Sequence, residues 1–226
     1  SCVQGDCPSF LTVVPGRRTR RAHRSGRTRR TRASTSRRDL DTSGLPAPAM
    51  VVDRDDCTVR LSGIGGTGVV TVSQILGTAA MLDGLHVRGL DQTGLSQKAG
   101  PVVSDIRLTR GEPRASNRAS TGSVDVLLAF DVLVASSDAH VAGASPDRTR
   151  VVASSSAVGT GSMVVHPDTA FPQHEAIARL QASARSVATI DALANTTAAL
   201  GDAAMANVYL LGVAVQHGVI PVDPTR

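Results

Sequence analysis

The residue spacing that most clearly suggests a binding site is that of four glycines: Gly63, Gly65, Gly66 and Gly68. A β-prone run at residues 57–61 leads into them, and an apolar helical pattern from about 67 to 81 follows. Strand, glycine turn and helix form the opening unit of a doubly wound α/β domain. Glycine lets the backbone turn where a Cβ would clash, and the free N–H groups at the helix start can bind phosphate or carboxylate.

The glycine motif by itself leaves the ligand open. Gly63, Gly65 and Gly68 satisfy the dinucleotide pattern G-x-G-x-x-G, whereas Val69 stands where a P-loop needs its lysine, which excludes a P-loop. A dinucleotide site also needs an acidic residue at the end of the second strand. Asp91, directly after the β-prone run 85–90, is the best candidate. The alternative is a tight strand-to-helix turn that binds nothing.

Two cysteines near the start of the sequence are candidate metal ligands. Cys2 and Cys7 are separated by four residues, and Pro8 follows, so a turn can present both thiolates to a metal or cluster. Two ligands are not a complete site, and Cys57 is too far along the chain to be an obvious third. A disulfide or two unpaired thiols remain as alternatives, although three cysteines argue against a secreted disulfide framework.

Other catalytic constellations are missing from the sequence. His174 and Glu175 are followed by Ala178 at the position where a metalloprotease helix needs its second histidine. The sequence also contains no Gly-x-Ser-x-Gly nucleophile elbow. If the protein is an enzyme, its chemistry is expected to lie largely outside this chain.

Charge divides the chain into two parts. Residues 1–50 hold 11 of the 24 basic residues and 3 of the 19 acidic ones, a net charge of +8, which leaves a net charge of −3 for the remainder. The Arg-rich segment 15–50 has no large apolar stretch to bury, so it is predicted to be a disordered linker. Such a run can bind RNA or anionic lipid, but it has no aromatic residues to stack on bases. A solvated tether is therefore favoured, and nucleic acid is not expected as a partner.

Residues 51–226 are predicted to form one α/β domain, a Rossmann-like parallel sheet flanked by helices. A polar loop that contains Gln97 and Lys98 follows the second strand, and a third strand at 102–108 has Asp105 and Arg107 on its polar face. Further strands are expected up to Asp131, at 150–154 and at 187–190, with helices after Phe171 and on both sides of Gly201. Asp191 and Asp202 are the expected N-caps of the last two helices, and Met205 is expected on the apolar face of the second. Loops at the carboxyl edge of such sheets bind ligands, which singles out the glycine turn and the 97–98 loop.

No apolar run approaches the roughly 20 residues that span a bilayer, and the start of the sequence does not resemble a signal peptide. A cytoplasmic protein without a membrane partner is therefore expected. The sequence begins with Ser1 and not with methionine, which suggests a fragment of a longer chain.

Three stretches taken together are more specific than the glycines alone. They are residues 63–68, residues 91–107, and the C-terminal set Gly201, Asp202, Met205, Asn207, Leu211, Gly212, Gln216 and Pro221. In this order and spacing they resemble the gamma domain of 2-oxoacid:ferredoxin oxidoreductases, most closely the fused indolepyruvate type. Residues 1–14, with Cys2 and Cys7, resemble the end of the thiamine-diphosphate region that precedes this domain in the fused chain.

The resemblance implies an enzyme that oxidatively decarboxylates a 2-oxoacid such as indolepyruvate to an acyl-CoA. Thiamine diphosphate, iron–sulfur clusters and coenzyme A would take part, with thiamine-binding modules and ferredoxin as partners and a homo-oligomer as the assembly. The loops at the carboxyl edge of the sheet supply a candidate cofactor-binding set for a phosphate-bearing reactant: Gly63, Gly65, Gly66, Thr67, Gly68, Gln97 and Lys98. A docking face towards the thiamine-binding modules is the alternative role of both loops. The resemblance of residues 1–14 implies a metal-binding set, Cys2 and Cys7. The Arg-rich linker departs from the family pattern. A stand-alone dinucleotide-binding oxidoreductase that uses Asp91 and an Arg-tailed nucleic-acid-binding protein are the competing classes.

Overall fold

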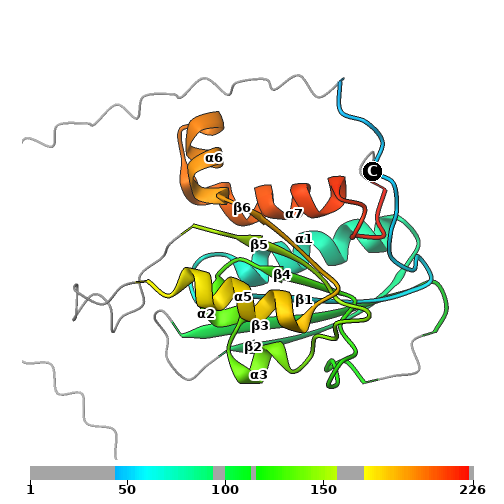
Figure 1. Ribbon diagram of the computed structural model, residues 1–226. Coiled ribbons are helices and arrows are strands. Elements are labelled where there is room, and N and C mark those ends of the chain that lie inside the picture. The colour runs from blue at the N-terminus through cyan, green and yellow to red at the C-terminus, as the bar shows by residue number, and fades with distance from the viewer. Residues whose placement is uncertain (1–43, 94–99, 113–115, 157–170, 224–226) are drawn as a thin grey trace, which may run out of the picture. The chain divides into compact units, whose positions relative to one another are not determined.

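The computed structural model describes residues 44–93, 100–112, 116–156 and 171–223, and a six-stranded sheet forms their centre (Figure 1). The strands lie in the order β2-β3-β1-β4-β5-β6. Their bounds are β1 (Asp56–Ile64), β2 (His86–Thr93), β3 (Pro101–Thr109), β4 (Val126–Ala129), β5 (Arg150–Ser154) and β6 (Ser186–Ile190). The predicted tail at 1–14 and the linker up to residue 43 lie outside the described residues.

Helices cover both faces of the sheet, as the sequence predicts. Their bounds are α1 (Val69–Leu82), α2 (Val132–Ala135), α3 (Asp138–Val141), α5 (Gln173–Ser183), α6 (Ala192–Leu200), the short 3₁₀ helix η1 (Ala203–Met205) and α7 (Ala206–Gln216). Figure 1 shows α1 and α7 on one side of the sheet and α2 and α5 on the other. Each side has its own hydrophobic core. None of these helices is long and apolar enough to cross a membrane.

The sheet is mixed, which corrects the prediction of a wholly parallel one. Strands β1, β4, β5 and β6 are parallel neighbours, whereas β3 lies antiparallel between β1 and β2. The chain between β2 and β3 is the reason. Only residues 94–100 join Thr93 to Pro101, and a parallel crossover needs roughly a dozen residues or more. The Rossmann-like α/β class is confirmed, with one strand reversed.

The core between β1 and α1 is aliphatic. Val59 and Leu61 on β1 are fully buried, and Val72 and Leu76 on α1 are almost fully buried against them. Each such side chain contributes about 1.5–3 kcal/mol relative to an exposed one. The protein thus forms its interior from branched aliphatic residues, as its aromatic content of 2% requires.

A buried ion pair joins β1 to β3 on the other face of the sheet. Arg60 and Asp105 are direct neighbours in the antiparallel register, and the guanidinium donates twice to the carboxylate, Nε to Oδ1 at 2.7 Å and Nη2 to Oδ2 at 2.9 Å. The predicted faces of β3 are confirmed, with Val102, Ile106 and Leu108 in one core, and Asp105 on the opposite face is fully buried. Removing one partner of a buried pair costs about 3–5 kcal/mol, so the pair constrains this register strongly.

The C-terminal helices follow the predicted capping but not the predicted face. Asp191 accepts from Ala194 N and Asp202 from Ala204 N, and Gly201 separates the two segments at a φ of 74°. The sequence places Met205 on the apolar face of the last helix, whereas Met205 is 52% exposed. The reason is that Met205 belongs to the 3₁₀ helix η1, and α7 begins only at the next residue, Ala206.

The chain before β1 lies against the end of α7. Val51 N donates to Gly218 O at 2.9 Å, and Gln216 Nε2 donates to Pro46 O at 2.8 Å. Gly218 has a φ of 68°, and a Cβ there would lie 2.6 Å from the carbonyl carbon of Ala49. Glycine is therefore required at this position for both its conformation and its lack of a side chain.

We expect Gly218→Ala to lower the free energy of unfolding by about 2–4 kcal/mol, since it adds left-handed strain to a backbone clash. Gly212→Ala is the matched control, because a Cβ on that residue of α7 meets nothing within 4 Å. The control should raise stability by up to about 1 kcal/mol, as alanine favours helix. Urea unfolding of both variants measures the difference, and equal effects would contradict the contact with Ala49.

Candidate functional site

The glycine turn joins β1 to α1, and its glycines serve two different purposes. A Cβ on Gly63 would lie 2.9 Å from Val69 Cγ2 and 3.1 Å from Phe130 Cβ, so this glycine lets α1 and the end of β4 approach β1. Gly66 and Gly68 have φ values of 85° and 92° and open space where a Cβ would be. They are needed for backbone conformation, and they leave the surface of the turn accessible.

The start of α1 is open. Gly68 precedes the helix, and no side chain caps it. Thr67 does not supply a cap, because its hydroxyl donates back to Ile64 O at 2.7 Å. The first N–H groups of α1 therefore lack a side-chain acceptor, and together with the helix dipole they favour an acceptor atom from a ligand.

The loop predicted to work with the glycine turn begins and ends beside it. Gly65 N donates to Gly100 O at 2.8 Å, and Thr93 pairs with Val102 where β2 and β3 meet the same edge of the sheet. Gln97 and Lys98 themselves lie outside the described residues, as do Cys2 and Cys7.

Asp91 does not occupy the position that a dinucleotide site needs. It lies inside β2, where Ser104 Oγ of β3 donates to its Oδ1 at 2.5 Å. β2 continues to Thr93 because its polar residues pair with β3, and β3 separates it from β1. The expectation that Asp91 follows the end of the second strand is therefore wrong.

A cavity of about 390 Å³ opens beside the glycine turn, at the carboxyl edge where β1 and β4 lie side by side. The chain order reverses there, since β3 and β4 lie on opposite sides of β1. This is the usual ligand crevice of an open α/β sheet. Its wall combines the turn with residues of five further segments, among them Asp131, Ser154, Leu193, Ala203 and Asn207.

Asp131 is the most unusual residue of this cavity. It is 3% exposed, and its Oδ1 accepts from Val134 N at 2.8 Å, which caps α2. Its Oδ2 is buried and has no hydrogen-bond partner among the described residues. Burial raises the pKa of this carboxyl above its ordinary value, against the lowering effect of the backbone N–H groups. The sequence predicts Asp131 only as the end of a strand. An acidic residue directly after an apolar strand was the signal for its role.

A side chain from α7 fixes the glycine turn. Asn207 Nδ2 donates to Thr67 O at 2.8 Å. Asn207 belongs to the C-terminal stretch and Thr67 to the glycine stretch, two of the three stretches that carry the family resemblance. The contact explains why both occur in one pattern.

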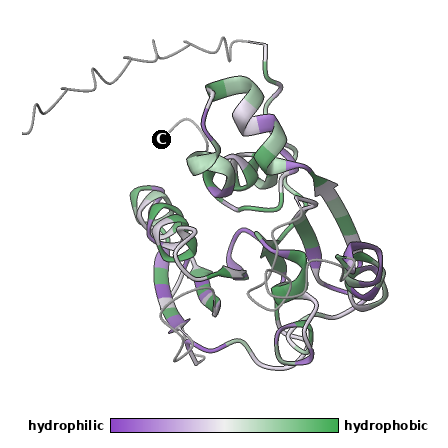
Figure 2. Cartoon of the chain, turned by 90° about the vertical axis from the view of Figure 1, so that its left-hand side faces the viewer, coloured by the Kyte–Doolittle hydropathy of each residue, from purple (hydrophilic) through white to green (hydrophobic). Residues whose placement is uncertain are grey.

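Figure 2, which views the molecule from the left-hand side of Figure 1, shows that α6, at the top, is mostly hydrophobic or neutral.

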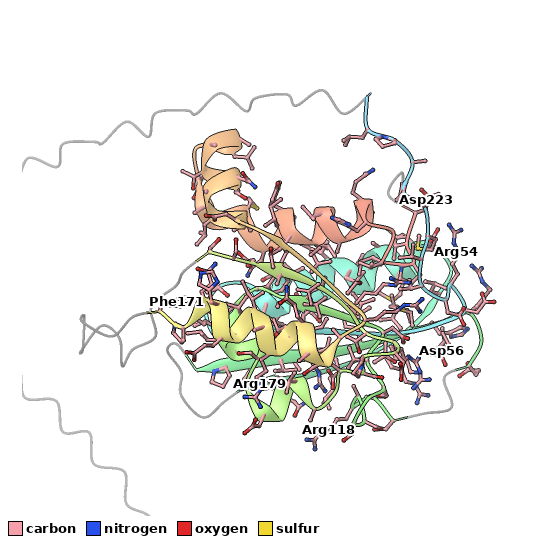
Figure 3. All side chains as sticks on the ribbon, viewed as in Figure 1. Arg54, Asp56, Arg118, Phe171, Arg179 and Asp223 are labelled. Atoms are coloured by element: carbon pink, nitrogen blue, oxygen red, sulfur yellow. The ribbon has the colours of Figure 1, made fainter. Side chains whose placement is uncertain are left out.

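Charged side chains gather at the opposite edge of the sheet. Arg107 donates to Asp56 at 2.6 Å, and Arg148 pairs with Asp125 beside the first residues of β4 and β5. Figure 3 shows Asp56 at one end of the sheet and Phe171, which precedes α5, at the other. Within the described part of the chain, the side chains that line the 390 Å³ cavity include no Lys, Arg or His.

The described residues offer no metal centre. No group of three or more His, Cys, Asp or Glu side chains among them is placed to hold an ion. Cys57 is fully buried in the core, and burial raises the pKa of its thiol, with a further rise from Asp125. Cys57 therefore belongs to the core and to no group of candidate metal ligands among the described residues.

These features define an α/β domain with a ligand crevice at the switch point of its sheet. The family described as "Pyruvate ferredoxin/flavodoxin oxidoreductase" matches residues 58–226. The chain therefore belongs to this family, and the resemblance drawn from the three stretches is confirmed.

Similar proteins carry the name "Indolepyruvate oxidoreductase subunit IorB". The one from Thermococcus kodakarensis is 35% identical over 73 residues, which are 32% of this chain and 35% of that protein. The one from Methanothermobacter thermautotrophicus is 27% identical over 165 residues, which are 73% of this chain and 81% of that protein. The matched part thus spans about a third of the first relative and most of the second.

Solved structures share the fold. The pyruvate oxidoreductase subunit PORC from Thermotoga maritima has a TM-score of 0.50 at 18% identity and covers 74% of this chain and 79% of its own. The 2-oxoglutarate:ferredoxin oxidoreductase from Magnetococcus marinus has a TM-score of 0.51 at 15% identity, over 72% of this chain and 24% of its own. At these identities the likeness supports the fold alone.

The raised pKa of Asp131 predicts a specific pH dependence of stability. The carboxyl of an unfolded aspartate has a pKa of about 3.9. Above that pH the native state binds more protons at Asp131 than the unfolded state does, so the free energy of unfolding falls as pH rises. Asp131→Asn keeps the cap and removes this titration, so wild type should lose stability relative to the variant as pH rises from about 4. Urea unfolding across a pH series measures it.

Asp191→Asn is the control with the opposite sign. The N–H of Ala194 and the hydroxyl of Ser156 lower the pKa of Asp191. Wild type should therefore gain stability relative to this variant as pH rises towards about 3.9, and the difference should change little above that pH. Parallel curves for wild type and Asp131→Asn would contradict a raised pKa at Asp131.

Proposed function

We propose that this chain is the gamma-domain part of a 2-oxoacid:ferredoxin oxidoreductase of the indolepyruvate type. The family match over residues 58–226 carries the proposal, and the similarity to subunits named indolepyruvate oxidoreductase supports the substrate. In the complete enzyme, a 2-oxoacid and coenzyme A give acyl-CoA and carbon dioxide, and the electrons pass singly to ferredoxin. The enzyme is expected in the cytoplasm as a homo-oligomer.

The decarboxylation and the electron transfer of this enzyme take place on partner modules. Thiamine diphosphate supplies carbanion stabilisation when it is bound there, and iron–sulfur clusters carry the electrons. The described residues fit neither group, because they hold no set of metal ligands and the cavity side chains carry no positive charge. We assign Cys2 and Cys7 to a cluster that is completed by cysteines of the thiamine-binding region.

The glycine turn fits one phosphate group of coenzyme A. Gly66 and Gly68 leave open space above the backbone, and the start of α1 is uncapped. We propose that the N–H groups at the start of α1, which the glycine turn leaves accessible, donate to this phosphate, and that Gln97 and Lys98 complete the site. The alternative role for both loops is a docking face for the thiamine-binding modules.

The function is tested on the complete enzyme. The chain is tagged in its own organism, and the purified assembly is examined for thiamine-binding modules, iron and thiamine. It should reduce ferredoxin when supplied with indolepyruvate and coenzyme A together, but not with either alone. An isolated chain that binds a nicotinamide cofactor, or RNA in a salt-sensitive way, would instead support one of the competing classes.

We expect Lys98→Ala to raise the KM for coenzyme A with little change in kcat, because a phosphate contact made equally in ground and transition states affects binding alone. Lys98 is the only lysine of the chain, so Arg88→Ala, on the same hairpin, serves as the control for lost positive charge. Loss of assembly or of bound thiamine with normal coenzyme A kinetics would refute the phosphate site and favour the docking face.

A further inference from the structure

The cavity at the carboxyl edge has largely apolar walls. Ala203 and Ala204 of η1 and Ala206 of α7 present only methyl groups, and Phe130 and Leu193 add an aromatic ring and a branched side chain. The volume of about 390 Å³ falls in the range of roughly 300–1,000 Å³ that small-molecule sites occupy. A wall of methyl groups and one ring suits a planar, largely apolar ligand.

The donors of the cavity side chains are already used. Thr67 Oγ1 donates to Ile64 O at 2.7 Å. Asn207 Nδ2 donates to Thr67 O at 2.8 Å and to Thr67 Oγ1 at 3.4 Å, which uses both of its N–H groups. Ser154 Oγ lies 2.9 Å from Ser156 Oγ. Because Ser156 gives its only hydroxyl proton to Asp191 Oδ1, Ser154 must be the donor in that pair.

One hydrogen-bond acceptor in the cavity is left without a partner. Asp131 Oδ2 lines the same cavity, is buried, and has no partner among the described residues. A buried polar atom without a partner costs about 1–3 kcal/mol, so a bound group that pairs with it gains this free energy. The ligand must therefore bring the donor. The positive end of the α1 dipole at the cavity disfavours a cation as that donor.

We propose that this cavity binds a planar heteroaromatic ring that donates an N–H to Asp131 Oδ2. The apolar walls enclose the ring, Phe130 contributes an aromatic surface, and the carboxyl oxygen selects rings that carry a donor. Two sources share this chemistry: an indole, as in the substrate class proposed above, and the exocyclic amino group of an adenine. The first source rests on the proposed function, and the second does not.

The composition of the chain allows a direct binding test. The full chain has no tryptophan and one tyrosine, so the fluorescence of added indole is read almost without background. Indole is titrated against the protein, and 1-methylindole, which has the same ring without the donor, is the matched ligand. Adenosine and its N6,N6-dimethyl form are compared in the same way by ligand-observed NMR.

We expect indole or adenosine to bind at least about tenfold more tightly than its methylated form, the value of one hydrogen bond to a carboxylate. Asp131→Asn keeps the α2 cap but replaces Oδ2 by an amide, and it should remove this preference. Asp191→Asn, an N-cap carboxylate that does not line the cavity, should leave the preference intact. Indole binding alone identifies the substrate-like source, and adenosine binding alone identifies a nucleotide.

Ala204→Leu provides a second variant that alters no polar group. Ala204 is an exposed residue that lines the cavity, so a larger side chain there should block the ring without disturbing the core. Binding of neither ligand, equal binding of the methylated forms, or binding unaffected by both variants would overturn the proposal. The assay needs no turnover, so its failure leaves the proposed enzymatic function untouched, and an inactive enzyme leaves the cavity assignment untouched.

Discussion

The close approach of α1 and β4 to β1 at Gly63 is the contact on which the rest of the structure depends. With Val69 Cγ2 2.9 Å and Phe130 Cβ 3.1 Å from the position of a Cβ, any larger residue would force the helix away from the sheet. The open start of α1 would then move away from the end of β4 and from Asp131. The crevice therefore depends on Gly63 having no side chain. Gly66 and Gly68, which have positive φ angles, determine only the backbone path at the edge of the crevice.

Much of the fold could be predicted because its signals are local. Alternation along β3, the caps Asp191 and Asp202, and the break at Gly201 each depend on a few neighbouring residues, and the structure confirms them. What failed depends on pairing between distant segments. The reversed direction of β3 follows from the length of a loop, and the burial of Asp105 follows from a partner 45 residues away.

The candidate site shows the same division. The glycine turn was identified from sequence because its residue types state the backbone requirement directly. Asp91 was misplaced because nothing local shows that β3 inserts between β2 and β1. The role of Asp131 was missed because an orphaned oxygen can be recognised only once the walls around it are known. Polarity also separates the two edges of the sheet, with arginine–aspartate pairs at one and an apolar crevice at the other.

The hydrogen bonds from Val51 to Gly218 and from Gln216 to Pro46 hold the two ends of the described domain next to each other. A domain whose chain enters and leaves at one place needs no rearrangement to be joined to other sequences. Its interior contacts are the same whether a neighbour is covalently attached or arrives as a separate polypeptide. The fold is thus compatible with both a fused and a separate polypeptide. The place where another sequence would be attached lies at the end of α7, away from the crevice at the start of α1.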